Sequence, residues 1–237
     1  MAEKLTPEKI EEIAKNFEKI QDKKIPIIKS EKETVKLDYG SLDQLRPNDK
    51  PKAPDKRILP LIPPSDPRLL MQIAPFIDDT LKEFDFKDRV DLSKVMYDSM
   101  VKYGGLGLSA NQVGLPYRMF VMGGHPQIED GKVRSVFNPL INDVSKETVQ
   151  FKEGCLSYPF LFLTITRPKW CHVKYTDQHG KEIEEILHGM SARVFQHENE
   201  HMNGYVFTDL VSKFKLDRAE KARMKMIKEF AKGGAIR

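Results

Sequence analysis

The sequence predicts an α+β fold, with mostly antiparallel β-sheets around a central helix that carries an H-E-x-x-H motif. An N-terminal helical and extended extension precedes this fold, and a C-terminal helix follows it. Short β-type runs, separated by Gly, Pro and Asp, predict strands joined by turns. Apolar residues at helical spacing predict the helices. Short strands linked in this way favour antiparallel pairing, which is typical of the class.

Composition limits the classes of protein that this chain can be. Of its 237 residues, 40% are hydrophobic, which is enough for an ordinary core. The net charge of +4 is too small to indicate nucleic-acid binding by itself. Two cysteines, Cys155 and Cys171, are too few for a disulfide framework and favour a reducing compartment.

The first residues carry no recognisable targeting segment. They are acidic and lack the apolar stretch of a signal peptide. No apolar run in the chain reaches the length of a membrane span. We therefore expect a cytoplasmic protein with neither a membrane nor a sequence-specific nucleic acid among its partners.

Residues 1–56 form the first predicted region, an N-terminal extension. Thr6 and Pro7 are typical of a helix start, because proline at the first helical position loses no needed N–H. Apolar residues then recur at helical spacing: Ile10, Ile13, Phe17 and Ile20. Residues 23–56 are rich in Lys, Asp and Pro, which predicts a linker or a strap along the domain.

Residues 57–212 form the second predicted region, a compact domain. Gly104 and Gly105 end a helix whose apolar residues recur at helical spacing. Asn203 and Gly204 can end another helix through a left-handed residue. The expected strands cover residues 58–62, 119–122, 135–140, 162–166 and 172–176, and the expected helices cover residues 92–103 and 189–203.

Residues 213–237 form the third predicted region, a basic C-terminal helix. Residues 211–237 carry nine Lys or Arg against three Asp or Glu. The apolar residues that define its expected apolar face are Phe214, Ala222, Met226, Ile227 and Phe230. A solvated charged face is one interpretation of the basic side, and an interaction surface is the other.

The strongest chemical signal is the segment from His197 to His201, which reads H-E-N-E-H. Residues four apart lie on one helical face, so both imidazoles can reach one metal ion. Glu198 lies beside them, where it can move a proton to or from a metal-bound water. The alternative is a surface helix that carries two histidines by chance.

A catalytic metal site needs a third protein ligand, with one position left open for water. Downstream candidates are poor: Phe207 stands where a metzincin would have its third histidine, and no histidine follows His201. Glu220 has a thermolysin-like spacing but lies in a Lys/Arg-rich stretch that looks solvent-facing. The upstream candidate is Cys155, which an ordinary buried thiol would also explain.

Three sequence blocks now identify a resemblance. Residues 153–157 read E-G-C-L-S, and residues 196–204 read Q-H-E-x-x-H-x-x-G. Residues 105–112 match G-x-G-x-A-x-x-Q except for Ser109. In this order the blocks resemble those of peptide deformylases, across residues 57–212. The resemblance implies hydrolysis of the N-formyl group from N-formyl-methionyl nascent peptides.

The resemblance also implies a metal centre. Cys155, His197 and His201 would hold one divalent ion, with water in the fourth position. The family typically uses Fe²⁺, and Zn²⁺, Ni²⁺ or Co²⁺ can occupy such a site. Cys171 is expected to be an ordinary buried thiol.

The remaining site residues follow from the same resemblance. Glu198 would transfer the proton, while the Gln112 side-chain amide and the Leu156 backbone N–H would stabilise negative charge on the formyl oxygen. Glu153 and Arg167 would form either a buried pair that orients the metal loop or a trivial exposed pair. The expected substrate-binding residues are Leu106, Gly107, Gly154, Met190 and Val194, of which Leu106, Met190 and Val194 could equally be core packing.

Several residues depart from the family pattern. Ser109 replaces a usual alanine, and Glu200 replaces the usual aspartate between the histidines. Residues 159–162 read P-F-L-F where many bacterial members carry a polar stretch with an arginine that helps hold the peptide, and Phe162 cannot donate those bonds. Arg193 stands where many bacterial members are apolar. Bacterial members contact the ribosome through a basic C-terminal helix, which gives residues 213–237 the same expected role.

Three hypotheses about function remain at this point. The first is a deformylase. The second is an HExxH metallopeptidase, which has no use for Cys155 or Gln112. The third is an inactive binding protein with the deformylase fold, and the presence of all five polar site residues argues against it.

Overall fold

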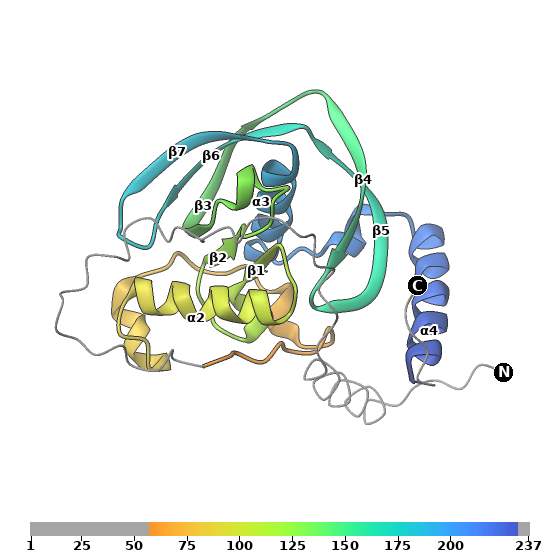
Figure 1. Ribbon diagram of the computed structural model, residues 1–237, viewed down its shortest axis with the longest axis horizontal. Coiled ribbons are helices and arrows are strands. Elements are labelled where there is room, and N and C mark those ends of the chain that lie inside the picture. Colours follow the sequence, from red (N-terminus) through yellow and green to blue (C-terminus); the bar gives the residue numbers. More distant parts are fainter. Residues whose placement is uncertain (1–56, 232–237) are drawn as a thin grey trace, which may run out of the picture. The chain divides into compact units, whose positions relative to one another are not determined.

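The computed structural model describes residues 57–231, which lie within one compact unit, Asp55–Arg237. The helix and linker expected in residues 1–56 lie outside the described residues, as do residues 232–237. The expected mixed fold with antiparallel sheets and a C-terminal helix is confirmed (Figure 1). None of the described helices has the length and apolar composition needed to cross a membrane.

Two antiparallel sheets make up the β-structure of the described residues. The first has the strand order β1-β2-β3-β6-β7, and the second is the hairpin β4-β5. The strands are β1 (Gly107–Ser109), β2 (Met119–Met122), β3 (Arg134–Val144), β4 (Thr148–Cys155), β5 (Tyr158–Pro168), β6 (Trp170–Thr176) and β7 (Glu182–His188). The α-helices are α2 (Arg89–Lys102), α3 (Gly189–Met202) and α4 (Lys213–Ala231). Short 3₁₀ helices cover Pro67–Leu70, Asp78–Phe84, Ala110–Val113, Glu129–Gly131 and Phe207–Leu210.

The five-stranded sheet lies between α2 and α3. Side chains alternate between the two faces of a strand. Accordingly, Met119 and Val121 of β2 join the core cluster around α2, whereas Phe120 and Met122 join the cluster around α3. All four side chains are buried, which explains why β2 reads as a continuous apolar run.

Helix α3 carries the H-E-N-E-H segment. It ends at Asn203 and Gly204, and Gly204 has the left-handed φ of 78° expected there. Arg118 completes this end, because its Nη1 donates to Met202 O at 2.9 Å and its Nη2 to Asn203 Oδ1 at 3.0 Å. A cation is favourable at a helix C-terminus, so the loop before β2 anchors the helix that bears both histidines.

The hairpin β4-β5 places Cys155 at its turn, where the register shifts between Gly154 and Cys155. Its inner face packs on Phe207, and α4 runs along β5. The turn of the hairpin therefore brings Cys155 to the site. At the opposite end of the hairpin, Thr148 pairs with Pro168.

The expected strand at residues 58–62 is wrong, because the segment pairs with no other strand. Pro60 and Pro63 lack the N–H that a ladder needs. Individual bonds hold the segment instead, from Leu59 N to Ser99 Oγ at 3.0 Å and from Ile62 N to Gln112 O at 2.9 Å.

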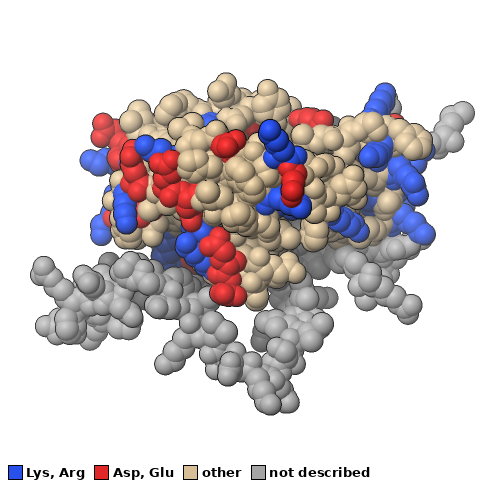
Figure 2. All heavy atoms as spheres, turned by 90° about the horizontal axis from the view of Figure 1, so that it is seen from above, with Lys and Arg blue, Asp and Glu red and all other residues tan. Residues whose placement is uncertain are grey.

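The expected apolar face of α4 is also wrong in part. Phe214 is 77% exposed, whereas Leu216 and Ala219 pack against the hairpin core. Arg223 follows on the same face and donates through Nε to Pro159 O at 2.9 Å. Figure 2 shows Lys and Arg side chains gathered around this end of the described residues; those of α4 that are exposed include Lys213, Lys215, Arg218 and Lys221.

Candidate metal centre and active site

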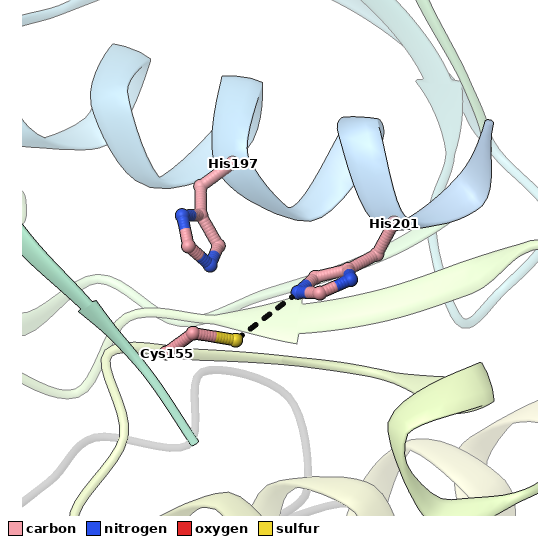
Figure 3. Close-up of side chains that lie close together, drawn as sticks. All are labelled: Cys155, His197 and His201. Atoms are coloured by element: carbon pink, nitrogen blue, oxygen red, sulfur yellow. Dashed lines mark hydrogen bonds between the residues drawn. The ribbon is translucent and has the colours of Figure 1, made fainter. Parts of the chain in front are cut away.

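Cys155, His197 and His201 converge on one point. Their ligand atoms all lie within 4.8 Å of one another. Figure 3 shows the two imidazoles projecting from successive turns of α3 toward the Cys155 sulfur, which lies 3.3 Å from His201 Nε2. The expected trio therefore comes together although Cys155 belongs to a different element.

The donor set fits a divalent metal. Nitrogen and sulfur donors of one tetrahedral ion lie about 3.3–3.6 Å apart. The Cys155–His201 separation of 3.3 Å agrees with that spacing. In addition, His201 Nδ1 is buried without a protein partner, and His197 Nδ1 is engaged elsewhere, so each ring has its Nε2 toward the cluster.

Glu153 orients His197 through the ring nitrogen Nδ1, which points away from the metal cluster. Its Oε2 lies 3.2 Å from His197 Nδ1, which is the arrangement that fixes the ring of a metal-binding histidine. Burial would lower the pKa of His197, but hydrogen bonds with Cys155 and Glu153 raise it well above its ordinary value. Burial and the charge of His197 lower the pKa of His201.

Two arginines hold Glu153 in turn. Arg167 donates Nε to Oε1 at 2.7 Å and Nη2 to Oε2 at 3.0 Å. Arg193 donates to the same Oε1 and also, through Nη2, to Val149 O at 2.8 Å. Burial alone would raise the pKa of Glu153, but bonds with His197 and Arg167 lower it to about 2. The Glu153–Arg167 pair is thus buried, not trivial.

Glu200 extends this group of charges outward. Arg167 donates Nη1 to its Oε1 at 2.5 Å and Nη2 to its Oε2 at 2.9 Å. The residue between the two histidines that differs from the family aspartate therefore helps to hold Arg167. From the sequence, Glu200 and Arg193 could be recognised only as departures from the family pattern, and their partners could not be predicted.

Glu198 is buried beside the cluster, and its carboxylate contacts β1. Ser109 Oγ donates to Oε2 at 2.6 Å. A Cβ on Gly107 would lie 2.5 Å from Oε1, so only glycine leaves room for this carboxylate. Burial raises the pKa of Glu198, although the charge of His197 opposes the rise. A raised carboxyl pKa suits a group that must both take up and release a proton.

Gln112 turns its amide nitrogen toward Cys155. Its Oε1 accepts from Ser109 N at 2.8 Å, which determines the orientation of the amide. Its Nε2 lies 3.0 Å from Ser157 Oγ and 3.4 Å from Cys155 Sγ. Leu156 follows Cys155 directly in the turn between β4 and β5. Both expected oxyanion donors thus lie next to the metal ligands.

The expected substrate-binding residues fall into two groups. Leu106, Met190 and Val194 share the core cluster on the α3 side of the sheet. Gly107 lies against Glu198, and Gly154 precedes Cys155, with a Cβ there only 2.9 Å from Phe162 Cε1. These positions adjoin the site, and the assignment of the five residues to substrate binding remains a prediction.

Residues 60–217 match the family model described as polypeptide deformylase. A peptide deformylase of Maricaulis maris is 39% identical over 143 residues, covering 60% of this chain and 78% of the relative. A peptide deformylase of Thermotoga maritima is 44% identical over 117 residues, covering 49% of this chain and 68% of the relative.

Solved structures agree with the family match. The crystal structure of the Thermotoga maritima enzyme superimposes with a TM-score of 0.56 at 36% identity, covering 65% of this chain and 98% of that one. That of a peptide deformylase from Ehrlichia chaffeensis in complex with actinonin gives 0.61 at 38% identity, covering 71% and 97%. The matched region contains every residue of the site described above, and the chain belongs to the polypeptide deformylase family.

Proposed function

We propose that this chain catalyses the reaction of its family, removal of the formyl group from N-formyl-methionyl peptides, at the centre formed by Cys155, His197 and His201. The observation that carries the proposal is the convergence of these three ligands with Glu198 and Gln112. An HExxH peptidase would not need a thiol within 3.3 Å of its second histidine.

One divalent metal ion completes the site. The family is metal-dependent, and a donor set of one thiolate and two imidazoles suits Fe²⁺, which we propose first, or Zn²⁺, Ni²⁺ or Co²⁺. When bound, the ion polarises the attacking water and the formyl carbonyl. Glu153 contributes by holding the His197 ring in its ligating orientation.

The protein's own groups carry the proton and the developing charge. Water adds its oxygen to the formyl carbon, and the C–N bond of the amide breaks to give formate and a free amine. Glu198 takes a proton from the water through its carboxylate and delivers it to the departing nitrogen. Gln112 Nε2 and the Leu156 N–H donate to the formyl oxygen as it becomes negative.

The methionine side chain would contact apolar residues on α3 and beside it. Leu106, Met190 and Val194 form one cluster there, and Met190 and Val194 lie about two turns and one turn before His197. Gly107 and Gly154 lack side chains at the points where an extended peptide backbone would approach. We propose residues 57–212 as the catalytic domain, with α3 as its central helix.

The C-terminal region, residues 213–237, is proposed to contact the ribosome through helix α4, Lys213–Ala231. Its exposed Lys and Arg side chains support the proposal, because phosphate attraction favours a basic surface (Figure 2). Nascent formyl-methionyl chains are made in the cytoplasm, which is the compartment we propose for the protein.

Formate release from formyl-Met-Ala-Ser tests the function. The protein is purified without oxygen and reloaded with Fe²⁺ or Ni²⁺, beside a Glu198→Ala control. We expect turnover by the wild type and a fall of about 10²–10⁴-fold in kcat for the control. Absence of turnover with one metal bound per chain would refute the proposal. Cys155→Ala should lose the metal, whereas an HExxH peptidase would retain it.

A further inference from the structure

We propose that the Ser109 hydroxyl is a positioning group that holds the Glu198 carboxylate for proton transfer; this inference rests on the proposed function and deepens it. Ser109 has no exposed surface, and its Oγ lies 2.6 Å from Glu198 Oε2. Among the described residues, Ser109 Oγ is the one hydrogen-bond donor to that carboxylate. Hydrogen bonds to ionised groups are the short and strong ones.

The strand geometry makes Ser109 a rigid support. Gly107 and Ser109 are two residues apart in β1, so both face α3. They pair with Met122 and Phe120 of β2, which keeps their spacing constant. Gly107 lies against one side of the Glu198 carboxylate, and Ser109 bonds the other oxygen. Oε1 is therefore left as the oxygen that exchanges protons.

Ser109 also connects Glu198 with the second polar group of the reaction. Its backbone N–H donates to Gln112 Oε1 at 2.8 Å, which directs Gln112 Nε2 toward Cys155. One residue thus orients both the proton carrier and an oxyanion donor. Because the Gln112 Oε1 contact uses the backbone N–H, it survives a side-chain substitution at Ser109. Such a substitution removes the bond of Oγ to the Glu198 carboxylate and its longer contact, at 3.2 Å, with the Glu198 backbone oxygen.

A buried serine that serves folding alone would look similar in isolation. Ser99 provides the matched case, since it is equally buried and its Oγ donates to Val95 O at 2.7 Å and accepts from Leu59 N at 3.0 Å. Neither Val95 nor Leu59 belongs to the site. Ser99→Ala therefore measures the cost of losing a buried hydroxyl without any effect on Glu198.

The first experiment compares wild type, Ser109→Ala, Ser109→Thr and Ser99→Ala, each loaded with Ni²⁺. For Ser109→Ala we expect kcat to fall about 10-fold, with KM within about twofold and metal content unchanged. Ser99→Ala should lower the melting temperature and leave kcat unchanged. Ser109→Thr keeps the hydroxyl and should recover most of the loss. If its added methyl lowers the melting temperature, the role of the hydroxyl is decided by Ser109→Ala compared with Ser99→Ala.

A double-mutant cycle and a structure decide the mechanism. In a Glu198→Ala background, Ser109→Ala should have no further effect on the residual rate, because the group it supports is gone. The crystal structure of Ser109→Ala should show Glu198 in more than one rotamer, a readout that needs no turnover.

The outcomes separate the two proposals. If the wild type turns over and Ser109→Ala matches it, with Glu198 still in one rotamer, the positioning role is wrong and the proposed function stands. Loss of metal in Ser109→Ala would likewise overturn it, by showing a structural role. If the metal-loaded wild type shows no turnover, both proposals fail.

Discussion

Two buried networks of arginine and glutamate lie in this molecule, and they serve different ends. In the first, Glu153 is the buried centre and accepts bonds from Arg167, Arg193 and His197. In the second, Arg134 is the buried centre and donates to Glu185 at 2.8 and 3.0 Å and to Glu129 at 2.6 Å.

The difference lies in what each centre touches. Glu153 shares His197 with the metal cluster. Arg193 of α3 also donates to the backbone of the hairpin, and Arg167 of the hairpin donates to Glu200 of α3. The Arg134 network joins β3 to β7, with Tyr175 donating to Glu185 at 2.8 Å, and none of these residues is a member of the cluster. Burial and perturbed ionisation occur in both networks, so they do not by themselves mark a catalytic site. The direct bond from Glu153 to the metal-ligand candidate His197 is what distinguishes the first network.

The largest difference is expected from Glu153→Gln. Two buried guanidinium groups would face a neutral amide, which should lower the unfolding free energy by about 3–5 kcal/mol. The released His197 ring should weaken metal affinity by about 10–100-fold. Urea unfolding of the metal-free protein and a Co²⁺ titration measure the two effects. Unchanged Co²⁺ affinity in a folded variant would remove the distinction between the networks.

Arg193→Met should have an intermediate effect. It removes one donor to Glu153 and the bonds to Val149 O and Ile165 O, but Arg167 still pairs with Glu153. We expect a loss of about 1–3 kcal/mol in unfolding free energy and a smaller loss of metal affinity than for Glu153→Gln. An affinity loss as large as that of Glu153→Gln would place the metal support on Arg193 instead.

Arg134→Met separates stability from function. Glu185 and Glu129 are partly exposed and can turn to solvent, so the unfolding free energy should fall by only about 1–3 kcal/mol. Metal affinity and kcat should match those of the wild type, because among residues 57–231 no hydrogen bond or ion pair joins Arg134, Glu129 or Glu185 directly to a residue of the metal cluster. A changed Co²⁺ spectrum would contradict that separation.

The acid stability of the second network gives a finer test. Burial would raise the pKa of Glu185, but bonds with Arg134 and Tyr175 lower it, and Arg134 lowers that of Glu129. A lowered folded pKa contributes stability above the unfolded value of 4.5, which is lost as the pH falls through the folded pKa. Arg134→Met should therefore lose less stability than the wild type when the pH drops from 5 to about 3. Parallel unfolding curves for both proteins would refute this.

The smallest effect is expected at the surface. Lys169 pairs with the exposed Glu147 at 2.7 Å, and such pairs contribute little in water. Lys169→Ala should leave unfolding, metal affinity and turnover unchanged within error. It serves as the charge-removal control for the arginine variants.

The sequence could predict the ligands and, as one of two alternatives, the buried Glu153–Arg167 pair, but not the other residues that support the site. His197 and His201 are neighbours by helical spacing alone, and Cys155 followed from its block. Ser109 and Arg193 were noticeable only as departures, because their partners lie 89 and 40 positions away in the chain and are determined by packing.

The same limit applies to the fold. Strand β2 was predicted at its observed bounds because both of its faces are buried. Strands β4 and β7 were not predicted, because each has an exposed face. In β7, Glu residues also interrupt the apolar pattern of the sequence. The segment at residues 58–62 has apolar character without strand pairing, which proline chemistry explains better than hydrophobicity does.

The hydrogen bonds around the metal cluster also bear on the order of folding. They join residues 43, 44 and 89 positions apart in the chain. Contacts of this separation close late, because long loops must be ordered first. Translation proceeds at about 5–20 residues per second, so Glu198 of α3 is synthesised about 4–18 s after Ser109. The contacts of β1 and of the hairpin with α3 can form only after this delay. The ligands exist as a set only after that closure, and metal uptake should therefore report the final folding step.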